Sequence, residues 1–597
     1  MAYGHSHHST LWLTIVSALV VAGCALALAA CGALPTPPRT EVPEPNATSA
    51  PRPKATATPV DVAAAATPPL ASGEVRRPAP GGPLSPFVTD DFLGPGTCAL
   101  CHSFLTDRSG ANVSMITAWR STMMAHAAID PVWQAKVSAE VARQPELQAV
   151  IEEKCVTCHM PMAQTQAKVA GQPVAALGEG FANRAHPLHA VAIDGVSCTL
   201  CHQVTERNLG EPAGFSGGYV IDTATNPPDR RIYGPYENPL IPQMRAHTGY
   251  IPTYGEHMLS AEHCATCHNL YTPYVDASGT VLGEFPEQTP YTEWLHSAYA
   301  GETVSCQRCH MPLAEGAVVI SQMPRRLAAR QPFFQHWFVG GNRFMLQILA
   351  DWGADLEVTA EQAELRTTID RVEAQVTERT AQMSVVDVAL ADQVLTARVR
   401  VETLTGHKFP TSFPSRRAWL HVTVTDAAGQ VVFESGRPGA DGRIAGNAAD
   451  GDPLAYEPHY DVITAGDQVQ IYEPIMANSD GEVTYTLLRA ASYVKDNRLL
   501  PRGADKAALP ADIAVFGVAR DDATFVGGSD EVTYRVDVGS AVGPFTVEAA
   551  LLYETLSYRF VQDLLAEGTE LTERFGGYYA LADKTPLVVA TASQRSD

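Results

Sequence analysis

The chain has 597 residues, 45% of them hydrophobic, and its 65 acidic side chains exceed its 42 basic ones to give a formal net charge of −23. This balance argues against nucleic acid as a ligand, because phosphate binding relies on a clustered basic surface. It favours a redox partner protein with a basic docking face, whose association would be fast and sensitive to salt.

The N-terminal segment, residues 1–31, predicts an export signal or anchor, because residues 11–31 form an uncharged apolar run. Cys31 follows small residues, as does Cys24, and both resemble the lipidated cysteine of bacterial lipoproteins. We favour lipidation at Cys31; the alternative is an uncleaved membrane helix, since about 20 apolar residues span a bilayer. Both alternatives predict a membrane-anchored, extracytoplasmic protein, at the periplasmic face or the cell surface. Residues 32–90, rich in Pro, Ala and Thr, predict an extended tether.

The segment 91–345 contains five copies of Cys-x-x-Cys-His. The thiols are Cys98, Cys101, Cys155, Cys158, Cys198, Cys201, Cys264, Cys267, Cys306 and Cys309, and the histidines are His102, His159, His202, His268 and His310. Two thiols that form thioethers with haem vinyl groups and an imidazole that binds the iron are the requirements of c-type haem attachment. The pattern therefore predicts five covalently bound c-type haems in a helical and irregular domain.

Two other interpretations of the cysteine pairs are weaker. A zinc site needs four ligands near one point, but zinc gives no reason for a histidine after every pair. A thioredoxin-like dithiol needs one pair after a strand in a βαβ unit, and no such frame is visible. The five motifs use ten of the twelve cysteines, so a structural disulfide is not expected in the mature chain.

The second axial ligand of each haem is expected among the remaining histidines between Cys98 and Phe344. Eight are present, and five hexacoordinate irons need five of them. We predict ligands among His126, His336, His296, His186, His189 and His247. His257 is ranked lower because His247 is preferred to it. His263 is ranked lower because it adjoins a motif cysteine. Met123 lies on the same predicted helix face as His126, so either side chain is a candidate.

Residues 346–386 predict a helical connector, and residues 387–597 predict an antiparallel β-sandwich. Alternating apolar residues in "VLTARVRVE", "LHVTVTDAAGQVVFESG", "EVTYRVDVG" and "FTVEAALLYETLSYRFV" indicate strands, with no comparably strong helix between them. The fold class expected is α+β multidomain. The stretch "GHKFPTSFPSRR" holds His407, Lys408, Arg416 and Arg417, which could line an anion site, but a turn with surface charges is the favoured interpretation.

Several stretches resemble the multihaem cytochromes c of the c-552/4 type, which are related to nitrifier tetrahaem cytochromes and hydroxylamine oxidoreductases. They are "WRSTMMAHAAIDPVW", "DGVSCTLCHQV", "TPYTEWLHSAYAGETVSCQRCHMP" and "HWFVGGN", with "LTGHKFPTSFPSRRAWLHVTVTDAAG" further on. The resemblance implies extracytoplasmic electron transfer between closely packed haems. It differs at Met123, where the family usually has histidine.

Two functions follow from these observations. The first is an electron-transfer relay between a membrane-side donor and an extracytoplasmic acceptor. The alternative is a multihaem oxidoreductase that acts on a small nitrogen or sulfur compound at one open haem. No Cys-x-x-Cys-Lys motif of the ammonia-forming nitrite reductases occurs, and the relay is favoured, so an electron carrier is expected rather than a dedicated catalyst.

Overall fold

The computed structural model describes residues 77, 79, 81–276 and 278–596. The chain divides into two compact units, Met1–Ala63 and Ala64–Asp597, and all of the described residues belong to the second. The predicted lipidation site at Cys31, the alternative Cys24 and most of the tether lie outside the described residues. Among the helices that are described, none is both long and apolar enough to cross a membrane.

The first part of the second unit, residues 81–342, is called the motif region here and consists of short helices joined by long loops. Its helices are α2 (Pro95–His102), α3 (Met115–Arg120), α4 (Pro131–Arg143), α5 (Gln148–His159), α6 (Pro161–Val169), α7 (His189–Ala192), α8 (Cys198–Cys201), α9 (Ile241–Thr248), α10 (Ala261–His268), α11 (Pro290–Leu295), α12 (Ala298–Gly301) and α13 (Cys306–His310). Two small sheets join them: a parallel pair, β1 (Arg230–Gly234) with β2 (Tyr250–Tyr254), and an antiparallel pair, β3 (Leu270–Val275) with β4 (Val281–Gln288).

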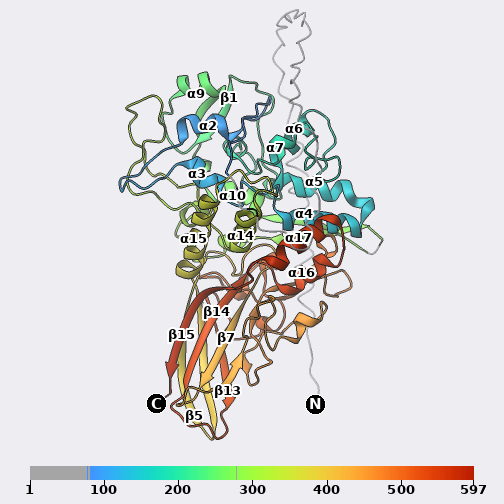
Figure 1. Ribbon diagram of the computed structural model, residues 1–597, viewed down its shortest axis with the longest axis vertical. Coiled ribbons are helices and arrows are strands. Elements are labelled where there is room, and N and C mark those ends of the chain that lie inside the picture. The colour runs from blue at the N-terminus through green and yellow to red at the C-terminus, as the bar shows by residue number, and fades with distance from the viewer. Residues whose placement is uncertain (1–76, 78, 80, 277, 597) are drawn as a thin grey trace, which may run out of the picture. The chain divides into compact units, whose positions relative to one another are not determined.

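Two helices connect this region to the sheets: α14 (Arg343–Trp352) and α15 (Gln362–Arg379). The predicted helical connector thus contains a helix of 18 residues, α15, which begins with a capping box between Glu361 and Glu364. Seven of the ten residues of α14 are buried, because its apolar residues pack on α15 and on the common core. Figure 1 shows both helices between the motif helices and the long strands.

Residues 381–596, called the sheet region here, contain two main sheets. One has the order β10 (Ile471–Tyr472), β7 (Arg417–Thr425), β14 (Thr546–Glu554) and β15 (Leu587–Arg595), with β8 (Val431–Ser435) also paired to β7. The other has the order β5 (Ala381–Ala391), β6 (Val394–Thr403), β13 (Ser529–Asp537) and β9 (Val462–Ile463). A separate antiparallel pair is formed by β11 (Pro474–Ala477) and β12 (Ser492–Asp496).

The long strands arise from the alternation of the sequence. On β6, Leu395, Ala397, Val399 and Val401 are all buried, and they share one hydrophobic cluster with the buried residues of β7, β13 and β14. The pairing is antiparallel in both sheets except between β13 and the two-residue β9, which run parallel. The long strands run side by side in Figure 1.

The expectation that no strong helix interrupts the strands is wrong. The stretch predicted as strand from Phe545 to Val561 is strand only as far as Glu554, and α16 (Tyr558–Leu565) follows. The side chain of Ser557 caps this helix by accepting a hydrogen bond from the Phe560 backbone N–H. A second helix, α17 (Glu570–Leu581), packs on α4 of the motif region.

Candidate functional site

Each of the five motifs lies on a short helical turn. Helices α2, α5, α10 and α13 end at the motif histidine, and α8 spans the two cysteines of the third motif. In a helix, residues at positions i, i+3 and i+4 lie on the same face. Both thiols and the imidazole of a motif therefore lie on the same face of its helical turn.

These faces meet at one cavity of about 1690 Å³ in the motif region. All ten motif cysteines and all five motif histidines line it. The ten thiols are free, so no disulfide competes for them among the described residues. The cavity also has aromatic and methionine side chains in its wall, such as Trp119, Tyr219, Met244 and Phe333, and this largely apolar surface suits a large planar cofactor.

Four of the five motif histidines have a hydrogen-bond arrangement that leaves Nε2 available for a metal ion. In these four, Nδ1 faces a backbone carbonyl oxygen: His102 that of Ile320 (2.8 Å), His159 that of Ala127 (2.9 Å), His202 that of Tyr233 (2.6 Å), and His310 that of Val339. An Nδ1–H that donates to a carbonyl fixes the tautomer and leaves the Nε2 lone pair for a metal ion. Burial lowers the pKa of all five, to about 4 for His159 and His268, which favours the neutral ligand form.

Thiols of different motifs touch one another. Cys98 lies close enough to Cys198, Cys158 to Cys267, and Cys264 to Cys306 for the two thiols of each pair to shift each other's pKa. The first motif therefore adjoins the third, and the fourth motif adjoins both the second and the fifth. These thiol contacts place the five motifs in two groups of neighbours, the first with the third, and the second and fifth with the fourth.

One predicted ligand lies directly opposite a motif histidine. The rings of His336 and His202 are nearly parallel, at 14°, with centres 6.3 Å apart. Two imidazoles on opposite sides of one metal ion would have centres about 6.2 Å apart, since each metal–nitrogen bond is about 2.0 Å and each nitrogen lies about 1.1 Å from its ring centre. The gap between His336 and His202 has the size that one iron needs.

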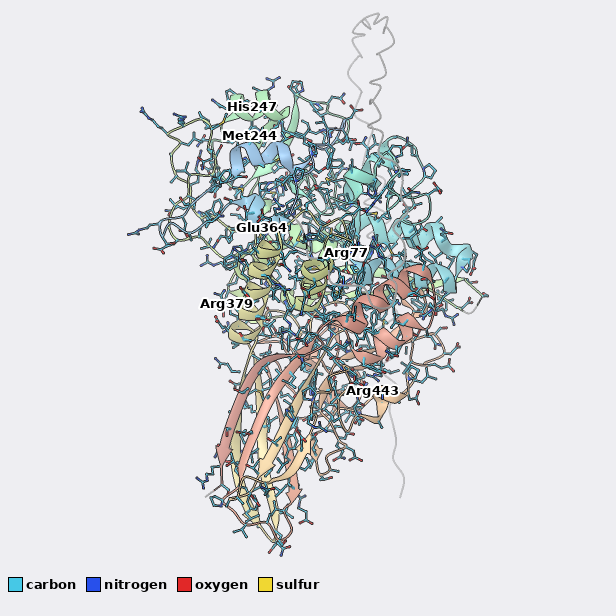
Figure 2. All side chains as sticks on the ribbon, in the orientation of Figure 1. Arg77, Met244, His247, Glu364, Arg379 and Arg443 are labelled. Atoms are coloured by element: carbon cyan, nitrogen blue, oxygen red, sulfur yellow. The ribbon has the colours of Figure 1, made fainter. Side chains whose placement is uncertain are left out.

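The other predicted ligands divide into two groups. His247, on α9 beside Met244 (Figure 2), lines the cavity. His126, His186, His189 and His296 are not among the residues that line it. The Nε2 of His189 instead lies 3.4 Å from a carboxylate oxygen of Glu357, and this hydrogen bond helps to raise the pKa of His189 against the effect of burial.

Met123 and His126, the two alternative ligands on one stretch of chain, differ in their position relative to the cavity. Met123 lines the cavity, whereas the buried His126 does not, and its Nδ1 lies 2.7 Å from the Thr122 carbonyl oxygen. A thioether is thus closer to the cavity than the imidazole on the same turn of chain.

Sequence reasoning missed two histidines in the cavity wall. The sequence ranks His263 low because it adjoins Cys264, yet His263 lines the cavity, and its buried Nδ1 has no hydrogen-bond partner within the described part of the chain. His407 lies outside the interval from Cys98 to Phe344, but its ring centre is 6.1 Å from that of His310, at an interplanar angle of 22°. A search for ligands in the sequence would have included His407 only if it had considered the histidines of the whole chain rather than those of the motif segment.

The turn-and-surface-charge interpretation of "GHKFPTSFPSRR" is wrong for two of its charges. The side chains of Lys408 and Arg417 are 0% exposed. Lys408 Nζ lies 2.6 Å from Asp496, and Arg417 binds Asp450 at 2.6 Å. Each charge is buried because a carboxylate from a distant part of the chain neutralises it.

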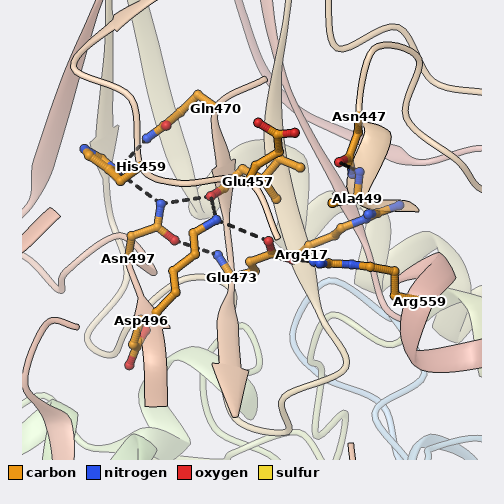
Figure 3. A network of polar contacts seen from close by, with 12 residues as sticks. Arg417, Asn447, Ala449, Glu457, His459, Gln470, Glu473, Asp496, Asn497 and Arg559 are labelled. Atoms are coloured by element: carbon orange, nitrogen blue, oxygen red, sulfur yellow. Dashed lines mark hydrogen bonds and ion pairs between the residues drawn. The ribbon is translucent and has the colours of Figure 1, made fainter. Parts of the chain in front are cut away.

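A second cluster with metal-ligand atoms lies in the sheet region. Atoms of His459, Asp522 and Asp530 that could bind metal are within 4.8 Å of one another, and all three residues are buried. The Nδ1 of His459 faces the amide nitrogens of Gln470 (2.8 Å) and Asn497 (3.1 Å), as Figure 3 shows.

Those amide orientations are fixed, because backbone N–H groups donate to the oxygen atoms of both amides. His459 Nδ1 must then accept, and Nε2 carries the proton that it donates to Asp522 at 2.9 Å. Neither nitrogen has a lone pair left for a metal ion. The cluster is a satisfied polar network of the sheet region.

No protein-family model and no curated protein matches the sequence. Among solved structures, a penta-heme cytochrome c552 from Thermochromatium tepidum is similar, with a TM-score of 0.45 and 16% sequence identity. The alignment covers 84% of this chain and 98% of that chain.

Proposed function

We propose that the protein is a c-type cytochrome that holds five haems and relays electrons. The observation that carries this proposal is the convergence of all ten motif cysteines and all five motif histidines on one cavity. The cysteines would bind the haems covalently, and the motif histidines would bind the irons through Nε2. Haem iron supplies the electron-transfer chemistry by changing between its ferric and ferrous forms.

The contacts between motifs support a relay. Thiol contacts link the first motif to the third and the fourth to the second and fifth. The third and fourth motifs are also close, because Cys201 of the third motif raises the pKa of Cys267, together with the larger effects of the neighbouring Cys158 thiol and of burial. We infer the order first, third, fourth, fifth, with the second motif as a branch at the fourth.

Each of the two motifs at the ends of this row contains an exposed residue. Leu100, between the cysteines of the first motif, is 72% exposed, and Cys309 of the fifth motif is exposed as well. Electrons would enter and leave there. The net charge of −23 supports redox partners with a basic face, and the apolar segment 11–31 supports a membrane-anchored, extracytoplasmic location.

One observation favours a second candidate, an oxidoreductase that acts on a small nitrogen or sulfur compound. Four histidines outside the motifs line the cavity in the described residues: His247, His263, His336 and His407. Five irons would need five, so at least one iron would have a methionine ligand or an open position.

The test is a haem count followed by the spin state of the ferric protein. The chain is expressed with its export segment in a host that matures c-type cytochromes, and haem is measured by the pyridine haemochrome and by mass. We expect five covalent haems per chain, and a chain without covalent haem would overturn the proposal. Ferric haems that are all low-spin and unchanged by cyanide would support the relay, whereas one high-spin haem that binds cyanide would favour the oxidoreductase.

A further inference from the structure

The sheet region sends a loop into the motif cavity. This loop joins β6 to β7, and ten of its residues line the cavity: Leu404, Thr405, Gly406, His407, Phe409, Thr411, Ser412, Phe413, Ser415 and Arg416. The sheet region therefore forms part of the wall of the cavity.

His407 faces the histidine of the fifth motif across this wall. Its ring centre lies 6.1 Å from that of His310, and the rings are within 22° of parallel. The pair of His336 and His202 has almost the same geometry, 6.3 Å and 14°. Both distances agree with the value of about 6.2 Å for two imidazoles on opposite sides of one iron.

The nitrogen atoms are also arranged for this role. Nδ1 of His407 lies 3.1 Å from the Lys408 carbonyl oxygen, and Nδ1 of His310 faces that of Val339. Both rings thus keep Nε2 for another partner, and His407 Nε2 has no hydrogen bond among the described residues. His407 is only partly buried, and the cavity that both rings line has room for such a partner.

Contacts with the motif region fix the loop on both sides of His407. The backbone N–H of Lys408 donates to a carboxylate oxygen of Glu293, on α11, at 2.9 Å. Gly406 packs against Trp294 and Tyr299 so closely that a Cβ atom would lie 3.2–3.3 Å from their rings. Such a held backbone limits the positions that the imidazole can take.

We propose that His407, from the sheet region, is the second axial ligand of the haem attached at Cys306 and Cys309. The inference rests on the proposed function, since it requires a haem at the fifth motif. It makes the sheet region necessary for the coordination of that haem, and it explains why a histidine far from the motifs lies in their cavity.

The test compares His407→Ala with His421→Ala in the full chain. His421 lies on β7, is bonded to Glu434 at 3.0 Å and does not line the cavity, so its substitution is the control. We expect one of five ferric haems to become high-spin in His407→Ala, by optical and paramagnetic resonance spectra, and added imidazole to restore the low-spin signal. His421→Ala should keep the wild-type spectrum.

A second variant covers the case in which His407→Ala does not fold. His407→Met would keep a ligand, and one haem should then show the spectrum and the raised reduction potential of histidine–methionine coordination. Five covalent haems with wild-type spectra in both variants would overturn the inference and leave the proposed function standing. A chain without covalent haem would overturn the proposed function itself.

Discussion

Arg498 links the sheet region to the motif region through a buried ion cluster. Its guanidinium makes two bonds to Asp496, Nε to Oδ1 at 2.9 Å and Nη2 to Oδ2 at 2.8 Å, and Nη2 also lies 3.1 Å from Glu293 on α11. The three side chains are 4%, 2% and 1% exposed. Burial would raise the pKa of Asp496, but the charges of Arg498 and Lys408 outweigh it and lower the pKa to about 2.

Arg498→Ala should destabilise the protein because it leaves two buried carboxylates without their shared cation. Removing one partner of a buried pair costs about 3–5 kcal/mol. Lys408 Nζ remains 2.6 Å from Asp496 and its backbone N–H remains on Glu293, so the lower end, about 3 kcal/mol, is expected.

Arg502→Ala is the matched control. Arg502 also joins the sheet region to the motif region, at 2.8 Å from Glu302, but the two side chains are 46% and 53% exposed. An exposed pair contributes about 0.2–1 kcal/mol because water screens it. The comparison separates burial from the mere presence of an arginine between the two regions.

The assay is denaturant unfolding followed by both tryptophan fluorescence and haem absorbance. We expect a clear fall of the midpoint for Arg498→Ala and a small one for Arg502→Ala. An equal fall of the midpoint in the two variants, or an unchanged midpoint in Arg498→Ala, would refute the reasoning that the buried cluster holds the two regions together.

Three further predictions concern the motif region. Burial raises the pKa of Asp130, a helix cap, to about 6. Its contribution to the free energy of unfolding therefore falls as the pH rises from about 4 to about 6. Asp130→Asn, which keeps the capping oxygen, should remove this pH dependence in thermal unfolding measured across the same range. Trp133 stacks on His159 with ring centres 4.6 Å apart, so Trp133→Leu should shift the paramagnetic resonance signal of one haem and spare the others. The double substitution of Cys198 and Cys201 by alanine should lower the haem count from five to four, and an unchanged count would contradict attachment there.

Local patterns in the sequence account for what could be predicted. A Cys-x-x-Cys-His motif is a property of one helical turn, and the alternation of Leu395, Ala397, Val399 and Val401 is a property of one strand. Both patterns can be recognised in the sequence without knowledge of the rest of the fold. The aromatic and glycine neighbours of His336 predict it as a ligand, but its position near His202 depends on tertiary structure.

Contacts between distant segments account for what could not be predicted. The sequence predicts that Lys408 is exposed, because burying a lone charge is costly. The carboxylate that neutralises it, Asp496, is 88 residues away in the chain. Likewise, only three residues separate the end of β14 from the start of α16, within a run of apolar residues that also fits a strand. The helix cap at Ser557 favours the helix. Apolar spacing alone does not distinguish a short helix from the end of a strand.

The same long-range contacts connect the sheet region to electron transfer. If His407 binds the haem of the fifth motif, the β6–β7 loop sets the coordination at one end of the row of haems, where a partner would exchange electrons. The buried cluster of Lys408, Asp496, Arg498 and Glu293 holds that loop against α11. Loosening the cluster should therefore affect the fifth haem before the other four. In Arg498→Ala, a high-spin fraction that appears below the unfolding transition, and is absent in Arg502→Ala, would show this coupling; simultaneous loss of all low-spin haem would argue against it.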